Sequence, residues 1–322
     1  MDWNCHNNKA MKRINGLITV LILISLMTAC SHSDLDKNGV PRELRIGIST
    51  STEEPTETFR RLEPLRLYLE RKLHMPVKLL KVNGYAPIIE AMKAKKIHMG
   101  SISPFSYLIA RKKSGAQAIF VLGTTDGLQR TSSSCIFTNR SSGLKTIDDI
   151  KANMSHLTLA FSDPASTSGH IIPRKFLMKN GIDPEKDFKK VVFTNDHAAC
   201  VLSLLSGKVD LACSQMTTLY RIKKLKKDFD PEKSLNMVWV SAPIPAQPWC
   251  IRKDINPQFR QKILDAYLSI KEDSAAWNAV VKGVQMYRDI SGDTLKYIPT
   301  KESWYDDLEK TVGSIEGIKL PE

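Results

Sequence analysis

Short hydrophobic runs alternate with amphipathic stretches through the first part of the chain. The runs predict strands at Leu44–Ser49, Val77–Val82, His98–Ile102 and Ala118–Gly123. The amphipathic stretches predict a helix that begins at Pro64 and helices at Pro87–Lys95 and Phe105–Lys113. Strands and helices that alternate at this spacing predict an α/β fold, in which a mostly parallel sheet is flanked by helices and ligands lie at the carboxyl ends of the strands.

A stretch rich in Gly, Thr and Ser, from Gly123 to Ser134, interrupts this alternation and reads as a crossover. Beyond it the pattern predicts strands at Cys135–Thr138, Leu157–Phe161, Val191–Thr194 and Val209–Cys213, with helices at Asp148–Ala152, Gly169–Lys179 and His197–Ser206. Strand-like runs with prolines follow at Asn236–Val240 and Trp249–Arg252, and the remainder is chiefly helical. We therefore expect residues 44–130 to form the first part of lobe 1, residues 131–240 to form lobe 2, and residues 241–322 to return to lobe 1 and add C-terminal helices, with a cleft between the lobes.

The start of the chain predicts export. The apolar run Leu17–Met27 follows Lys12 and Arg13, and its eleven residues are too few to cross about 30 Å of hydrocarbon as a helix. The residues before Cys30 resemble the lipobox of bacterial lipoproteins, with Met27 where Leu is usual. We expect residues 1–29 to be a lipoprotein signal peptide whose true start is Met11, Cys30 to carry the lipid, and residues 30–43 to be a tether. Ordinary secretion with a coincidental cysteine is the alternative.

Composition and charge narrow the class of protein. A chain of 322 residues with 42% hydrophobic and 25% charged residues can build packed cores and suits two domains. Its formal net charge of +13 is compatible with nucleic acid, anionic membrane or small anions as partners. The basic run Arg221–Lys227 has no interleaved aromatic residues and reads as a solvated helix face, and export separates the protein from nucleic acid. We expect no nucleic-acid partner.

Four cysteines remain after removal of the signal peptide and the lipidated residue: Cys135, Cys200, Cys213 and Cys250. Four cysteines allow three pairings, and disulfides persist outside the cytosol. Of these pairings we favour Cys200 with Cys213, which would join a helix to the strand after it. None of the cysteine spacings fits a zinc site, so neither a metal nor a cofactor is expected.

One loop has the composition of an anion site. Ser166, Thr167 and Ser168 precede Gly169 between a predicted strand and a predicted helix, where unpaired backbone N–H groups and hydroxyls can donate to an oxyanion. A simple N-cap is the alternative reading. His197, Tyr85 and Tyr107 also follow predicted strands and can donate hydrogen bonds, although structural roles remain open for each of them.

These motifs together carry a family resemblance. The chain resembles the phosphonate, phosphite and phosphate binding proteins of ABC importers. The motifs that carry the resemblance are Tyr85 with Ile88-Ile89-Glu90-Ala91-Met92, Ser103-Pro104-Phe105-Ser106-Tyr107, Asp163-Pro164 with Ser166-Thr167-Ser168-Gly169, His197 and Gly207-Lys208-Val209-Asp210. The resemblance implies a type II periplasmic binding protein that grips the ligand with both tyrosines, the Ser-Thr-Ser loop and the histidine. Two departures stand out. Lys95-Lys96-Ile97-His98 replaces a Gly-Lys-Ile-Asp turn, and Leu211–Thr218 lacks the carboxylates that pair with an ammonium group in relatives that bind aminoalkyl phosphonates.

The resulting hypothesis is a capture protein rather than an enzyme. It would bind phosphate, phosphite or a simple alkylphosphonate between its lobes as a monomer and deliver it to an ABC permease and its ATPase, facing the periplasm or the cell exterior. A hydrolase triad of Ser168, His197 and Asp210 is the enzymatic rival, but the chain has no G-x-S-x-G nucleophile elbow. A sensor component, or a binder of another solute such as a sulfonate, would keep the same fold.

Overall fold

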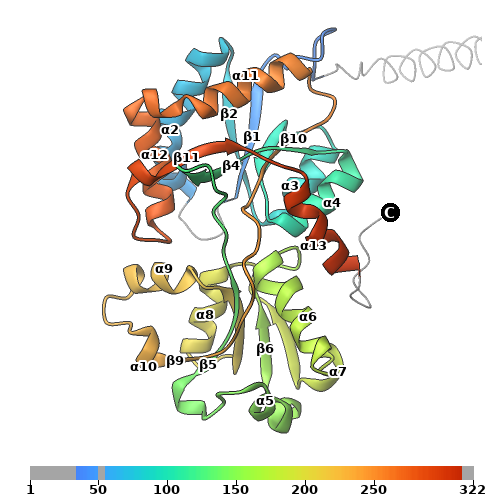
Figure 1. The fold of residues 1–322 in the computed structure, drawn as a ribbon, viewed down its shortest axis with the longest axis vertical. Coiled ribbons are helices and arrows are strands. Elements are labelled where there is room, and N and C mark those ends of the chain that lie inside the picture. Colours follow the sequence, from blue (N-terminus) through green and yellow to red (C-terminus); the bar gives the residue numbers. More distant parts are fainter. Residues whose placement is uncertain (1–33, 50–54, 314–322) are drawn as a thin grey trace, which may run out of the picture.

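The protein consists of two α/β lobes joined by two extended segments (Figure 1). The computed structural model describes residues 34–49 and 55–313. One lobe is built on a six-stranded sheet and the other on a five-stranded sheet, and helices flank both sheets. The predicted two-lobed α/β fold is confirmed.

The sheet of lobe 1 has the strand order β11-β4-β10-β3-β1-β2. Its strands are β1 (Leu44–Ser49), β2 (Val77–Val82), β3 (Met99–Ser101), β4 (Gln117–Thr124), β10 (Trp249–Ile251) and β11 (Leu295–Pro299). Its helices are α2 (Pro55–Leu73), α3 (Tyr85–Lys93), α4 (Pro104–Ser114), α11 (Pro257–Leu268), α12 (Ser274–Gln285) and α13 (Ser303–Gly313). The parallel pairs β1–β2 and β1–β3 point their carboxyl ends toward lobe 2.

The sheet of lobe 2 has the order β7-β6-β8-β5-β9. Its strands are β5 (Ser134–Asn139), β6 (Thr158–Phe161), β7 (Lys190–Phe193), β8 (Leu211–Gln215) and β9 (Leu235–Val240). Around them lie α5 (Ile147–Asn153), α6 (Ile172–Lys179), α7 (Pro184–Asp187), α8 (His197–Leu205), α9 (Thr218–Leu225) and α10 (Pro231–Ser234). A π-helical turn, Thr167–Ile171, leads into α6.

Both sheets are mixed, but most strands of each sheet run in the same direction, as expected, and the reversed strands are β10 and β11 in lobe 1 and β5 in lobe 2. In lobe 1, β10 lies between β3 and β4 and runs antiparallel to both, and β11 runs antiparallel to β4. In lobe 2, β5 runs antiparallel to β8 and to β9. The returning chain causes this in lobe 1, because β10 enters the sheet from the opposite end. The first helix also differs from its prediction, since α2 begins at Pro55 and contains Pro64 in its interior.

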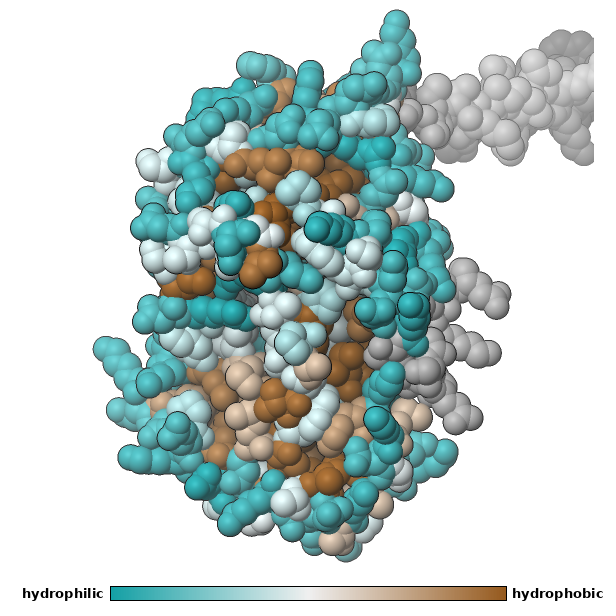
Figure 2. All heavy atoms as spheres, viewed as in Figure 1, coloured by the Kyte–Doolittle hydropathy of each residue, from teal (hydrophilic) through white to brown (hydrophobic). Residues whose placement is uncertain are grey.

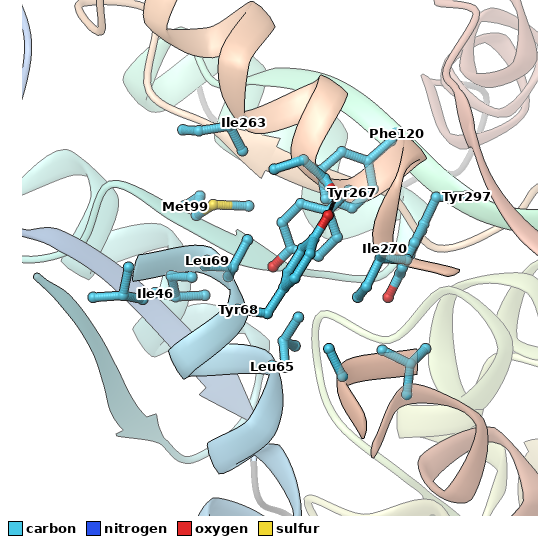
Figure 3. Packing of buried hydrophobic residues seen from close by; sticks show 14 of the residues in the cluster. Ile46, Leu65, Tyr68, Leu69, Met99, Phe120, Ile263, Tyr267, Ile270 and Tyr297 are labelled. Atoms are coloured by element: carbon cyan, nitrogen blue, oxygen red, sulfur yellow. Dashed lines mark hydrogen bonds between the residues drawn. The ribbon is translucent and has the colours of Figure 1, made fainter. Parts of the chain in front are cut away.

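Each sheet has hydrophobic clusters on both faces, which is why its strands read as near-continuous apolar runs. Figure 3 shows one cluster of lobe 1, where Tyr68 of α2 meets Tyr267 of α11 and Phe120 of β4. The Phe120 and Tyr267 ring centroids are 4.2 Å apart. The buried Tyr68 hydroxyl donates to the Ala266 carbonyl at 2.6 Å, so this polar atom is satisfied inside the core.

The chain passes between the lobes through residues 125–133 and 241–248. These crossing segments bond to each other, because the Ser132 amide donates to the Ile244 carbonyl at 3.2 Å and the Ile244 amide donates back at 2.7 Å. They therefore form a short two-stranded ribbon that joins the lobes.

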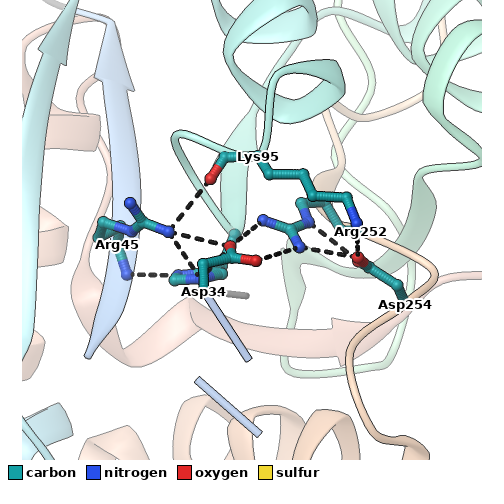
Figure 4. A network of polar contacts seen from close by, with 6 residues as sticks. Asp34, Arg45, Lys95, Arg252 and Asp254 are labelled. Carbon is teal, nitrogen blue, oxygen red and sulfur yellow. Dashed lines mark hydrogen bonds and ion pairs between the residues drawn. The ribbon is translucent and has the colours of Figure 1, made fainter. Parts of the chain in front are cut away.

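The tether predicted for residues 30–43 is wrong from residue 34 onward, because this segment is folded against lobe 1. Asp34 accepts hydrogen bonds from Arg252 at 2.5 Å and from Arg45 at 2.9 Å (Figure 4). Arg252 is 2% exposed and also bonds Asp254. A buried guanidinium needs such partners, so these bonds attach Asp34 to lobe 1. The predicted signal peptide and lipidation at Cys30 lie outside the described residues.

The predicted disulfide between Cys200 and Cys213 is absent from the structure. Cys135, Cys200, Cys213 and Cys250 are all free and buried. The Cys200 thiol instead lies 3.4 Å from the Cys213 carbonyl oxygen and 3.4 Å from the Ala160 carbonyl oxygen. Burial raises the pKa of the Cys200 thiol to about 12, which leaves it unreactive as a small core residue.

We expect a chain that begins at residue 31 to have the same free energy of unfolding with and without a reductant, because no disulfide constrains its unfolded state. Urea titrations followed by circular dichroism check this. The four thiols should react with a thiol reagent only after unfolding. A fall in stability with reductant would contradict the free thiols.

The surface shown in Figure 2 is hydrophilic around the outline of both lobes, and hydrophobic residues gather toward the middle of each lobe. No helix among residues 34–49 and 55–313 combines the length and the apolar character needed to cross a membrane.

Candidate functional site

A cavity lies between the lobes where their strands end. Its lining residues are Ser49, Gly84 and Tyr85 from lobe 1 and Ser162, Asp163, Asn195, Asp196 and His197 from lobe 2. Ser49 is the last residue of β1, and the others follow β2, β6 and β7, so all of them lie at the carboxyl ends of parallel strands, which is where open α/β sheets bind ligands. The cavity offers about 20 Å³ to the centre of a water-sized sphere, room for one or two waters. A tetrahedral oxyanion therefore requires its walls to move apart.

His197 is a neutral hydrogen-bond donor in this cavity. Burial lowers the pKa of its imidazole to about 4. The Gln215 amide lies 3.4 Å from Nδ1 and donates to it, which places the imidazole proton on Nε2. Nε2 lies 3.4 Å from the Ser166 hydroxyl. His197 can thus donate to a ligand oxygen without carrying a charge.

The three consecutive Ser and Thr residues make different contacts. Ser166 caps the π-helical turn by accepting the Gly169 amide at 3.0 Å, and it keeps its own proton to donate. Thr167 accepts the Phe105 amide of lobe 1 at 2.8 Å. Ser168 is 7% exposed, and its carbonyl accepts the Ser134 hydroxyl at 2.6 Å. The structure brings Ser166 beside His197, while Thr167 holds the two lobes together.

The two tyrosines lie in different environments. Tyr85 begins α3 and lines the cavity, and its hydroxyl lies 3.5 Å from Gln247 Oε1. Tyr107 is fully buried in the core of lobe 1, where its hydroxyl donates to Glu302 at 2.6 Å. Tyr107 is the fourth residue of α4, so its side chain turns back into the core. The structure therefore does not bring Tyr107 to the cavity, which corrects its choice as a site residue.

Two carboxylates line the cavity, and neither was predicted as a ligand contact. Asp163 accepts the Ala165 amide at 2.7 Å and, across the lobes, the Tyr85 amide at 3.3 Å. Asp196 caps α8 by accepting the Ala199 amide at 2.7 Å. Burial raises the pKa of each of these carboxyl groups, and it outweighs the backbone hydrogen bonds that lower it. No lysine or arginine is among the described residues that line this cavity.

Ser162 was also missed. It is the first residue after β6, and its buried hydroxyl has no hydrogen-bond partner. The sequence could have indicated these residues only by their positions, because Ser162 follows the end of a strand and Asp196 precedes the start of a helix.

Further contacts between the lobes put the molecule in a closed conformation. The hydroxyls of Ser103 and Ser106, at the start of α4, donate to the Ala165 carbonyl at 2.9 and 2.7 Å. Ile171 of lobe 2 packs into a hydrophobic cluster of lobe 1. Two lobes that close over a cavity lined by uncharged donors and carboxylates have the architecture of a type II periplasmic binding protein.

The chain belongs to the family described as "ABC transporter, phosphonate, periplasmic substrate-binding protein", whose model matches residues 48–305. The family predicted from the motifs is thereby confirmed. The family is extracytoplasmic and serves transporters as their substrate-binding component.

Relatives and solved structures agree with this family. The chain is 25% identical over 253 residues to the phosphonates-binding periplasmic protein of Escherichia coli, covering 78% of this chain and 72% of the relative. It is 24% identical to the phosphate-import protein PhnD of Mycolicibacterium smegmatis, covering 74% and 76%. A binding protein component of an ABC phosphonate transporter from Pseudomonas aeruginosa has the same fold, with a TM-score of 0.71, 20% identity, and coverage of 84% and 85%.

Proposed function

We propose that this protein captures a small phosphorus oxyanion, a phosphonate, phosphite or phosphate, between its lobes and delivers it to an ABC permease. The observation that carries the proposal is the interlobe cavity, where Tyr85, Ser162 and His197 converge from both lobes as uncharged donors. Uncharged donors hold an oxyanion without a permanent ion pair, so release remains possible. The relatives named for phosphonate and phosphate support this ligand class.

Capture and closure are coupled because the ligand contacts both lobes. Tyr85 and His197 belong to different lobes, so a ligand that contacts both favours a closed state in which the lobes lie slightly farther apart than in this structure and leave room for the ligand. Closure also forms the bond between the Phe105 amide and Thr167 and the packing of Ile171. The basic charge of the chain raises the local concentration of anions.

The ligand leaves chemically unchanged in this proposal. Asp210, a member of the rival triad, accepts the Thr158 amide at 2.7 Å at the beginning of β6. His197 lies beside Gln215, at the far end of the five-residue strand β8, about 16 Å along the strand. This separation leaves Asp210 without a role in orienting His197.

Membrane attachment through a lipidated Cys30 belongs to the proposal, and the lipobox-like sequence supports it. Initiation at Met11, cleavage before Cys30 and a position facing the periplasm or the cell exterior follow from the same pattern. The permease and ATPase are the partners that the family implies. A monomer is expected, since the chain supplies both walls of the cavity.

Sulfonates are the second ligand class that the fold permits. The periplasmic aliphatic sulphonate binding protein of Escherichia coli shares the fold at a TM-score of 0.56 and 14% identity. Fold alone does not fix the ligand, so sulfonates serve as comparison ligands in the test.

Tyr85→Phe should weaken methylphosphonate binding about tenfold in isothermal titration calorimetry, because it removes one hydrogen bond at the cavity. Tyr107→Phe is the matched control. It should leave the affinity unchanged and lower the free energy of unfolding by about 1 to 3 kcal/mol, since the hydrogen bond from the buried ring to the Glu302 carboxylate is lost. An affinity that falls in Tyr107→Phe and stays constant in Tyr85→Phe would overturn this site. Failure to bind methylphosphonate, phosphite and phosphate would overturn the proposed function.

A further inference from the structure

Two residues that line the interlobe cavity each have a buried polar atom without a hydrogen-bond partner: the Ser162 hydroxyl and Asp196 Oδ2. Buried polar atoms in folded proteins are nearly always paired, so each unpaired one requires an explanation. Both belong to residues that line the same small cavity. A ligand that completes both atoms is the simplest account of their shared location.

Only one of the two carboxylate oxygens of Asp196 has a hydrogen-bond partner within the protein. Its Oδ1 accepts the Ala199 amide and caps α8, which leaves Oδ2 as an open acceptor. Asp163, the other carboxylate of the cavity, differs because backbone amides donate to both of its oxygens. Asp196 is therefore the carboxylate that can accept from a ligand.

Other groups near Asp196 affect its charge. His197 is neutral, with a pKa of about 4, and burial raises the pKa of the Tyr85 hydroxyl above its usual range. Arg221 of α9 lowers the Asp196 pKa against the effect of burial. The Arg221 guanidinium also donates to the Tyr287 hydroxyl of lobe 1 at 2.7 Å. An oxyanion between Asp196 and His197 thus lies next to a carboxylate. The described lining residues include no lysine or arginine that would offset the repulsion between the two negative charges.

We infer that Asp196 Oδ2 and one ligand oxygen share a single proton, so the cavity selects a tetrahedral oxyanion that retains a P–OH group near neutral pH. This inference rests on the proposed function and narrows its ligand class. Two fully ionised oxygens are both acceptors and repel each other, whereas one proton between them makes a charge-assisted hydrogen bond. Sulfate has the same shape and is fully ionised near neutral pH, so the cavity rejects it.

The affinity for methylphosphonate is measured by isothermal titration calorimetry from about pH 6 to about pH 9, a range that extends above the second ionisation of such groups. The wild-type Kd should rise tenfold for each pH unit above that ionisation, because only the protonated ligand binds. The pKa values of His197 and Tyr85 lie outside this range. Sulfate at neutral pH should bind at least about a hundredfold more weakly than methylphosphonate.

Asp196→Asn tests the shared proton directly. Asparagine is as good an N-cap as aspartate, and its amide nitrogen donates to an ionised oxygen. In this variant the rise of the methylphosphonate Kd with pH should disappear, and the affinity for sulfate should increase about tenfold or more. Asp196→Ser, which also caps a helix and carries no charge, should lose the pH dependence as well.

Asp183→Asn is the matched control, since Asp183 caps α7 through the Glu185 amide and is absent from the cavity lining. It should keep the wild-type pH dependence. A wild-type Kd that stays constant with pH, or one that rises equally in Asp196→Asn, overturns the shared proton and leaves the proposed function standing. Tighter binding of 2-aminoethylphosphonate that Asp196→Asn abolishes would assign Oδ2 to an ammonium group and overturn it as well. Absence of binding to any phosphorus oxyanion would overturn the proposed function itself.

Discussion

Gly169→Ala should lower the affinity for methylphosphonate about a hundredfold or more, as measured by calorimetry. A β-carbon at this position would lie 1.6 Å from the Ser162 hydroxyl and 2.8 Å from Cε1 of His197. Ser162 and His197 both line the cavity, so a shift of either side chain changes the cavity. The Ser162 backbone is also held in place, because its amide donates to the Gly169 carbonyl at 3.0 Å. Overpacking of this kind costs about 1 to 3 kcal/mol, and here it acts on the ligand-binding loop.

The matched comparison adds Ser162→Gly to the Gly169→Ala chain. The second change removes the two shortest contacts and should recover most of the lost thermal stability, while the contact with His197 keeps binding weak. Wild-type affinity in Gly169→Ala alone would show that the ligand binds away from this loop.

The protein should lose stability steeply as the pH falls from 6.5 to about 4. Burial lowers the pKa values of His98, His170 and His197 to about 4, from the ordinary 6.5. In that pH range the unfolded chain binds protons at these histidines and the folded chain does not. The unfolded state is therefore favoured as the pH falls, by about 1.4 kcal/mol per pH unit for each fully buried histidine. The free energy of unfolding lost through three such histidines is comparable to the total stability of an ordinary domain, about 5 to 15 kcal/mol.

Urea titrations at a series of pH values measure this dependence. His170→Gln should reduce its slope by about a third, because it removes one of the three histidines. His156 has an exposed side chain, so His156→Gln is the control and should leave the slope unaltered. A free energy of unfolding that stays constant between pH 6.5 and about 4 would contradict neutral buried histidines.

The alternation of strands and helices was sufficient to predict two α/β lobes and their ligand-binding edge, because βα units place loops at the carboxyl ends of strands. The direction of β10 could not be predicted, since Trp249–Ile251 is three residues long and a hydrophobic run carries no direction. The contact of Asp34 with lobe 1 could not be predicted either, because its partner Arg252 lies 218 residues away in sequence.

The site was predicted in part. His197 and Tyr85 line the cavity, and Ser166 lies beside His197, but Tyr85 and Tyr107 looked alike because both follow strands. The structure separates them by their place in the following helix, the first residue of α3 and the fourth of α4. Which carboxylate faces the ligand depends on local hydrogen bonds and has no signature in the sequence.

One departure from the family pattern has a structural explanation. In lobe 2, Asp210 accepts the Thr158 amide through its carboxylate and donates its own amide to the Thr158 carbonyl. In lobe 1, His98 makes the corresponding pair with Arg45, since Nδ1 accepts the Arg45 amide at 2.9 Å. The imidazole therefore replaces the carboxylate at the residue just before a strand, and neither His98 nor Asp210 is among the residues that line the cavity.

The two hydrogen bonds between Ser132 and Ile244 have a mechanical consequence. Because these bonds join the crossing segments to each other, twisting one segment alone would break both bonds, so a motion of the lobes that preserves the bonds turns the two segments together. Fluorophores attached on opposite lobes should then report occupancy as a single change in separation, which makes the molecule a simple optical sensor for its ligand.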